Sequence, residues 1–273
     1  MKQTNKLKMI VAMAVSVTVA LLTASCSNDE FFGFDDMKDY TFTLESSIYS
    51  NDFQKYLDLD IDTIKKWSRK DLTILDEAEY RMGIRFDEKN RFYTRNYNTY
   101  LELNISEKLY NRIWDNYYHN NLILGETTSK KRVKKRNPEG AGIRYDCVPI
   151  SLSYCLATPY STVVRVCNNV DPGWNNRGVD LGYVGIIVDS LGYSMNTYYS
   201  PQEVRNHYGS SDIDINAMLI TSNTGGNPKY HAVCAYHYDG SSWWINKIFY
   251  NDYQGGYYNC WMAVSGVEYL FEF

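Results

Sequence analysis

The stretch YDCVPISLSYCLA, residues 145–157, places a cysteine directly before a Val-Pro step and a run of apolar and small residues. The run predicts a helix, and Pro149 favours a helix start because its missing N–H would have no partner in the first turn. The partial positive charge at a helix N-terminus favours the nucleophilic thiolate form of a cysteine. A cysteine near a helix is also commonly a small buried apolar residue, so this stretch leaves both interpretations of Cys147 open.

A partner for such a thiol has to come from the four histidines, His119, His207, His231 and His237. The segment KYHAVCAYHYDGSSWWINKIFYNDYQGGYY, residues 229–258, predicts a hairpin that turns at residues 239–240. His231 begins its first strand and Asn246 lies on the return strand. A hairpin can set a histidine beside a carboxamide that orients the ring, while the other ring nitrogen faces the thiol. His237 lies on the same strand as His231, an even six residues on, and we expect it to be structural. His207 falls within a capped helix, and we expect it to lie on the surface.

The chain from residue 142 onward is typical of a β-rich domain. Short β-branched or aromatic runs are separated by turn residues and predict strands: STVVRVC (161–167), GYVGIIV (182–188), NAMLIT (216–221), HAVCAYHY (231–238) and WWINKIFY (243–250). One helix is clearly marked within 200–209, with Ser200 as N-cap, Pro201 at the first position, Glu203 in a capping box and Gly209 as the stop. The sequence therefore predicts an α+β fold, in which the helix bearing Cys147 packs on an antiparallel sheet.

Residues 26–128 read as a separate, mainly helical region. Apolar residues recur at spacings of three and four within 61–84 and again within 106–118, which predicts two amphipathic helices, the second capped by Ser106. The stretch between them, residues 85–103, predicts a hairpin. This region could be a small helical domain packed under the main one or a pro-like domain.

A basic linker, residues 129–141, joins this region to the main domain, residues 142–273. Six of the eight residues from 129 to 136 are Lys or Arg, and Pro138 breaks any helix. The linker is either a solvated loop or a cleavage site after Lys135 or Arg136. In the second case residues 27–136 would restrain the main domain, as in a zymogen.

The N-terminus has the order of a secretory signal peptide. Three lysines precede an uncharged apolar stretch, residues 9–22, and small residues lead to Cys26. LLTASC resembles a lipobox, in which residues 1–25 are removed and Cys26 carries the lipid; ordinary cleavage near Ala24 is the alternative. The following SNDEFF resembles the start of Bacteroidetes lipoproteins that reach the cell surface. These features predict a lipid-anchored protein of the outer membrane.

Charge and composition exclude several classes of function. Removal of residues 1–25 takes away three lysines and no acidic residue, which leaves 25 basic against 32 acidic side chains. Such a chain is a poor nucleic-acid binder. No His, Cys or carboxylate cluster has the spacing of metal ligands, and we expect neither a metal nor another cofactor. After Cys26 the chain has five cysteines, so at least one stays unpaired within it; Cys155, Cys167, Cys234 and Cys260 are expected in the core or in disulfides.

The same stretches carry a family resemblance over roughly residues 142–262. YDCVPISLSYCLA resembles the Asp-Cys-x-Pro start of the double-glycine-peptidase-like branch of the papain-like cysteine peptidases, and HAVCAYHYDGSSWWIN with the later GGYY is similar to the histidine and asparagine strands of papain. The resemblance implies a papain-like fold with Cys147 as nucleophile, His231 as base and Asn246 as the residue that orients it. The glutamine that usually precedes the nucleophile as oxyanion donor is absent, and Asn137 is the nearest carboxamide. The usual Asn-Ser-Trp is absent as well, which makes Asp252 an alternative orienter.

These observations predict an exported, lipid-anchored cysteine peptidase whose substrates are peptides or proteins. The alternative is a surface lipoprotein that keeps the fold and binds peptides or cell-wall material with little or no catalysis.

Overall fold

The structure is a computed structural model, and it describes residues 51–125, 145–222 and 230–273. The expected signal peptide, the lipidation residue Cys26, the processing residues Lys135 and Arg136, and the carboxamide of Asn137 lie outside these residues. Within them, no helix combines the length and the apolar character that a membrane crossing needs.

The helical elements are η3 (Asn51–Tyr56), η4 (Ile61–Thr63), α2 (Arg69–Met82), α3 (Glu107–Leu124), α4 (Cys147–Cys155), α5 (Tyr160–Val170), η5 (Trp174–Asn176), η6 (Leu181–Tyr183), α6 (Val184–Ser190), α7 (Pro201–Tyr208) and η7 (Val264–Gly266). The strands are β1 (Arg85–Asp87), β2 (Phe92–Thr94), β3 (Asn196–Tyr198), β4 (Asp212–Ser222), β5 (Tyr230–Asp239), β6 (Lys247–Asp252), β7 (Tyr257–Ala263) and β8 (Tyr269–Glu272).

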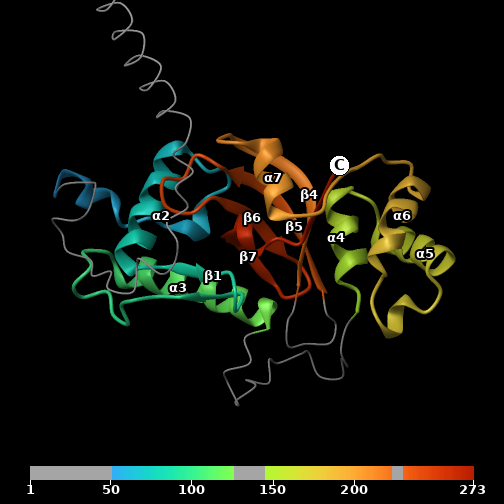
Figure 1. The fold of residues 1–273 in the computed structure, drawn as a ribbon, viewed down its shortest axis with the longest axis horizontal. Coiled ribbons are helices and arrows are strands. Elements are labelled where there is room, and N and C mark those ends of the chain that lie inside the picture. Colours follow the sequence, from blue (N-terminus) through green and yellow to red (C-terminus); the bar gives the residue numbers. More distant parts are fainter. Residues whose placement is uncertain (1–50, 126–144, 223–229) are drawn as a thin grey trace, which may run out of the picture. The chain divides into compact units, whose positions relative to one another are not determined.

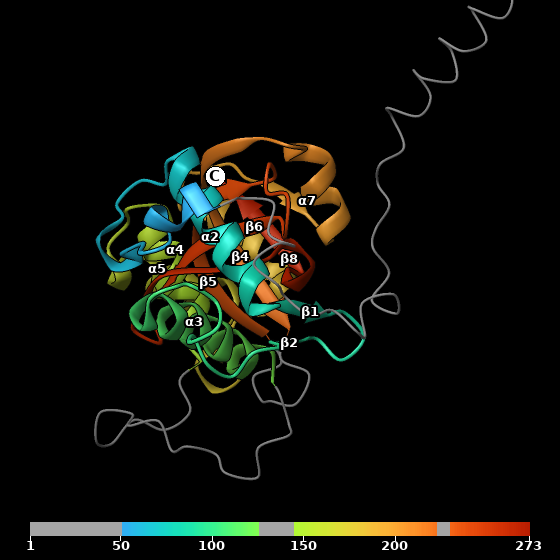
Figure 2. The same ribbon diagram turned by 90° about the vertical axis from the view of Figure 1, so that its left-hand side faces the viewer.

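The centre of the described chain is a six-stranded sheet in the order β3-β8-β4-β5-β6-β7, in which every neighbouring pair is antiparallel. Helices α2 and α3 lie on one side of these strands, and α4, α5 and α6 lie on the other (Figure 1). In the view turned by 90°, α2 and α3 stand in front of the strands (Figure 2). The predicted α+β class, with the Cys147 helix packed on an antiparallel sheet, is confirmed.

Several local predictions are confirmed because their signals are short-range. Ser200 accepts a hydrogen bond from the Glu203 N–H and Pro201 opens α7, which ends before Gly209. Ser106 caps α3, and the predicted hairpin within 85–103 is the β1–β2 pair. The first helix, α2, begins at Arg69, later than its apolar spacing suggested, because Ser68 and Asp71 form a reciprocal capping box there.

Two predicted strands are helices instead. STVVRVC lies in α5, where Val163 and Cys167 are buried, and GYVGIIV contributes to α6, where Val184, Ile187 and Val188 are buried. The buried residues are four apart in α5, and three and four apart in α6, which are helical spacings. Packing of that stripe against the core around α4 outweighs the strand preference of β-branched residues.

Helix α3 covers the exposed edge of the sheet. Strand β7 is an edge strand, and Trp261 in it uses its backbone C=O to accept from the side-chain amides of Asn116, at 2.8 Å, and Asn120, at 2.7 Å. The Trp261 backbone N–H donates to the Asn116 carboxamide oxygen at 2.9 Å. The two asparagines are four residues apart and so share one face of α3. They satisfy backbone groups that would otherwise be left open on an edge strand.

A buried ionic cluster joins α2 to the sheet. Lys247, the first residue of β6, contacts Asp76 through its ammonium group and lies 3.1 Å from Glu79 Oε2. All three side chains are fully buried. Burial and the Asp76 charge raise the pKa of Glu79, against the lowering effect of Lys247. The region 51–125 is therefore packed into the same core as the sheet.

The cluster generates a stability prediction. Lys247→Met would leave two buried carboxylates without their cation, and we expect it to lower the free energy of unfolding by about 3–5 kcal/mol. Urea denaturation followed by tryptophan fluorescence measures the loss. Lys108→Met is the matched control, because the Lys108–Asp60 pair is exposed and should change stability little. Equal stability of the Lys247 variant and the wild type would contradict the prediction.

Candidate active site

Cys147 is the first residue of α4, so the predicted helix start is confirmed. The C=O of the preceding Asp146 accepts from the Ile150 N–H at 2.9 Å, which closes the first turn. Pro149 falls within that turn, where a missing N–H costs nothing. Cys147 is buried, and its thiol lies where the first N–H groups of the helix have no partner inside the helix.

His231 and Asp252 form the other half of the arrangement. His231 is the second residue of β5, and Asp252 is the last residue of the neighbouring antiparallel strand β6. Their side chains meet with His231 Nε2 at 3.1 Å from Asp252 Oδ2. The Cys147 sulfur is close enough to raise the pKa of the same imidazole through hydrogen bonding and charge. Cys147, His231 and Asp252 therefore act on one another in that order, with the histidine in the middle of the line.

The electrostatics of this line favour a charged imidazole. Burial by itself lowers the pKa of His231, but the Asp252 carboxylate and the Cys147 sulfur outweigh it and raise that pKa to about 10. Burial raises the pKa of Asp252, yet the charge of His231 and hydrogen bonds from His119, His231 and the Gly255 N–H hold it well below its usual range. Asp252 is thus an anion that keeps His231 protonated.

Asn246 does not lie beside His231, which corrects the predicted orienter. The connection between the strands spans residues 240–246, so β6 begins at Lys247, which pairs with Asp239 at the far end of β5. Asn246 thus precedes β6 near the turn, whereas the strand end that reaches His231 carries Asp252. The position that the sequence offered as the alternative orienter is the one in contact.

A second histidine shares the same carboxylate. His119, from α3, places Nε2 at 3.3 Å from Asp252 Oδ2. Its side chain is 3% exposed, and its ring stacks on Tyr257 with centroids 3.7 Å apart. Sequence reasoning missed this residue, since its place in a helix of the N-terminal region gave no sign of a contact with residue 252. In the structure His119 lies on the buried face of α3, but the local sequence does not indicate what it contacts there.

Asp146 carries a small hydrogen-bond network next to Cys147. Its Oδ1 accepts from the side-chain amide of Gln254 at 2.7 Å, and its Oδ2 accepts from the Tyr160 hydroxyl at 3.2 Å. Gln254, two residues after Asp252, therefore brings a carboxamide to the residue before Cys147. Sequence reasoning looked for such a group only upstream of the cysteine and missed it.

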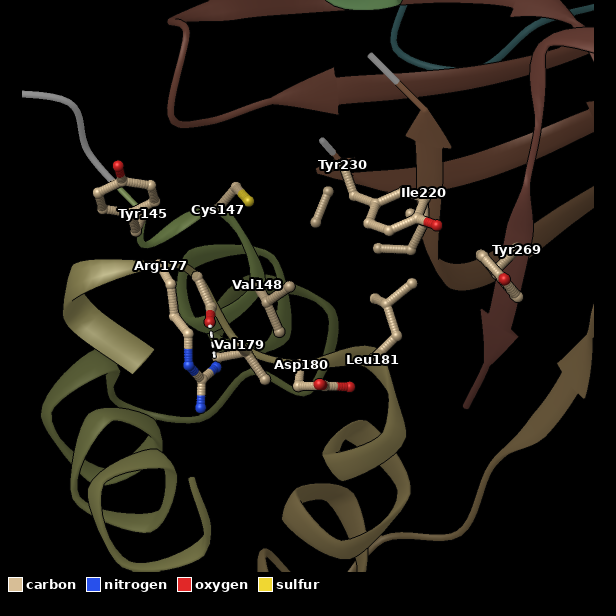
Figure 3. A pocket seen from close by; sticks show the side chains of 12 residues that line it. Tyr145, Cys147, Val148, Arg177, Val179, Asp180, Leu181, Ile220, Tyr230 and Tyr269 are labelled. Atoms are coloured by element: carbon tan, nitrogen blue, oxygen red, sulfur yellow. Dashed lines mark hydrogen bonds between the residues drawn. The ribbon is translucent and has the colours of Figure 1, made fainter. Parts of the chain in front are cut away.

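A cleft of about 450 Å³ opens beside Cys147. One wall comes from Tyr145, Val148 and the segment 177–181, and the other from Ile220, Tyr230, Ala232 and Tyr269 of the sheet. Figure 3 shows Cys147 between Tyr145 and Tyr230, with Val148 and Leu181 below them in this view. Arg177 also lines the cleft, and its guanidinium is paired with Asp171. The cleft therefore combines apolar and aromatic side chains with the charged side chains of Arg177 and Asp180.

The remaining histidines have other partners. His237 contacts Asp212 with Nε2 at 3.0 Å and Asp214 with Nδ1 at 2.9 Å, both on β4. A bulge between Ala235 and His237 interrupts the alternation of β5, so even spacing from His231 does not repeat its surroundings. His207 is about half exposed and lies 3.7 Å from Glu272.

Across the described ranges, no group of three or more His, Cys, Asp or Glu side chains is arranged to hold a metal ion. Comparisons with protein-family models, curated proteins and solved structures find no match. The chemistry of the site has to be argued from its own geometry.

The first site prediction concerns pH. Because the pKa of His231 is raised, its contribution to stability is fully present below the unfolded value of about 6.5 and is lost as pH rises through about 10. Asp252→Asn removes the anion, and we expect the pKa of His231 to fall. NMR titration of the His231 ring, together with the pH dependence of Cys147 carboxymethylation, measures the shift. Asp212→Asn, beside His237, is the control and should leave both curves unchanged; an unchanged His231 titration in Asp252→Asn would refute the assignment.

The second site prediction concerns His119. His119→Leu removes the buried imidazole that contacts Asp252, so we expect kcat for a peptide substrate to fall about 5- to 100-fold with KM nearly unchanged. His119→Gln keeps an N–H donor and should recover most of the rate. Steady-state kinetics with circular dichroism on both variants provide the measurement. Equal losses in both, with a damaged spectrum, would mean that His119 serves folding alone.

Proposed function

We propose that this chain is a cysteine hydrolase of papain-like type that cleaves peptide bonds at Cys147. The supporting observation is an imidazole that lies 3.1 Å from a buried carboxylate and whose pKa the Cys147 sulfur raises, beside an open cleft lined by Cys147. A nucleophile, a base and an orienting group in contact are the usual signature of covalent catalysis. The helix-on-sheet arrangement and the resemblance in residues 145–157 and 231–246 agree with this class.

The reaction would proceed in two steps. The Cys147 sulfur attacks the carbonyl carbon of the scissile bond, and the protonated His231 gives its proton to the departing amine as the C–N bond breaks. Water then attacks the thioester, His231 takes the proton from that water, and Cys147 leaves with the carboxylic acid as product. Asp252 keeps the imidazole oriented and stabilises its charge throughout.

The oxyanion of each step would form at the start of α4. The backbone N–H of Cys147 belongs to the first turn, whose donors point out of the helix end. Gln254 holds the side chain of Asp146, the residue before the nucleophile, and so places a carboxamide close to that helix start.

The cleft can contact a peptide through both apolar and polar groups. Its walls near Cys147 carry Val148 and three tyrosines, together with Asp180 and the Asp171-paired Arg177. A peptide in extended form fits such an open groove, as the resemblance also implies.

The role of the N-terminal region follows from His119 and the Lys247 cluster. Both bind residues 51–125 to the strand that ends at Asp252. We therefore propose that the N-terminal region stays part of the active enzyme and is not removed by cleavage after Lys135 or Arg136. Attachment through Cys26 to the outer membrane remains a prediction.

The proposal is tested at the thiol. We expect Cys147→Ala to lower hydrolysis of a casein-type substrate by at least about a thousand-fold while the circular dichroism spectrum stays intact. A peptide carrying a chloromethyl ketone should label the wild type at Cys147, as mass spectrometry of the digest would show. His237→Ala, which alters a histidine outside the line of contact, should keep labelling. A wild type that binds peptides but neither hydrolyses them nor reacts with the probe would instead be a binding protein.

A further inference from the structure

Two more cysteines stand in contact at the other end of the nucleophile helix. Cys155 is the last residue of α4 and Cys234 lies within β5, and their sulfur atoms are 3.1 Å apart. Cys155 Sγ also lies 3.4 Å from the Ala217 C=O, and Cys234 Sγ lies 3.1 Å from the Ser151 C=O. Both cysteines are free thiols in the structure.

This pair connects the same two elements as the catalytic contact. Cys155 follows Cys147 by eight residues in α4, about 12 Å along the helix axis. Cys234 follows His231 by three residues in β5, about 10 Å along the strand. Helix and strand therefore run side by side, with Cys147 and His231 at one end and the two thiols at the other.

The surroundings of the pair disfavour the thiolate form of Cys155. The hydrogen bond with Cys234, burial and the charge that Cys234 would carry raise the pKa of Cys155 well above its usual value. The thiolate is the reactive form, so oxidation at neutral pH is slow and speeds up as pH rises. The sulfurs need to approach by only about 1 Å to reach the 2.05 Å of a disulfide bond.

We propose that Cys155 and Cys234 are a redox-dependent crosslink that closes on reaction with an external disulfide, either a small molecule or a disulfide oxidoreductase. One cysteine attacks a sulfur of the external disulfide, whose S–S bond breaks and releases one thiol. The second cysteine then attacks the mixed disulfide and releases the other thiol. The pair loses two electrons and two protons, and the external disulfide gains them as two thiols.

The crosslink would clamp α4 to β5 without using the nucleophile. It encloses the chain from residue 155 to residue 234, a long loop whose closure restricts the unfolded state. It also fixes the two elements whose spacing sets the contact between Cys147 and His231. The bond therefore stabilises the frame of the site, while Cys147 stays a thiol.

The test uses the full-length chain with Cys147→Ala, so that the nucleophile cannot join the exchange. After incubation with oxidised glutathione at pH 9, we expect two fewer titratable thiols, a 155–234 crosslinked peptide in a non-reduced digest, and a Tm raised by roughly 5–15 °C over the dithiothreitol-treated sample. The same incubation at pH 7 should give slower closure.

Matched variants complete the test. Adding Cys155→Ala should abolish the crosslink and the Tm shift, whereas adding Cys167→Ala should keep both. The proposal is overturned if the thiol count stays constant after oxidation, if the crosslink joins other cysteines, or if closure leaves the Tm unchanged. Because these readouts are mass, thiol count and Tm, they are independent of whether the chain hydrolyses peptides.

Discussion

The buried carboxylate of Asp252 is the group on which the candidate site depends. Its side chain is 3% exposed, and such an anion is costly to bury unless charge and hydrogen bonds offset its lost hydration. Here His231, His119 and the Gly255 N–H supply that compensation. Because these partners come from β5, α3 and the turn after β6, the site exists only when distant segments are packed together.

Strand β6 places this carboxylate, and the N-terminal helices hold both of its ends. At its start, Lys247 is bound by Asp76 and Glu79 of α2. At its end, Asp252 is contacted by His119 of α3. These buried ionic contacts hold both ends of β6 and so fix its register along β5. The register in turn decides which residue of β6 lies next to His231. A helical region that resembles an appendage in the sequence therefore works as the support of the site.

The sequence predicted the features that local chemistry encodes and missed those set by long-range register. The caps at Ser106 and Ser200, and the helix start at Cys147, follow from residues within one turn. The strand predicted for STVVRVC is wrong. The segment is helical because one face of it packs against the core, and residues within the segment do not encode that packing. A hairpin that turns at residues 239–240 predicts Asn246 beside His231, whereas the observed connection of several residues slides β6 along β5 and brings Asp252 there. The contact of His119 crosses more than a hundred residues, and no local pattern encodes it.

The choice of a carboxylate rather than a carboxamide beside His231 has an electrostatic consequence. A neutral amide orients a ring by a dipole, whereas a full negative charge within 3.1 Å in a buried setting also stabilises the imidazolium. That stabilisation offsets the cost of burying the ring and holds the proton on His231 up to about pH 10. A protonated imidazole is also the group that the proposed reaction needs to give a proton to the departing amine. Asp252 in turn keeps its charge compensated through the His119 contact and the Gly255 N–H, so the support of the ring does not depend on His231 alone.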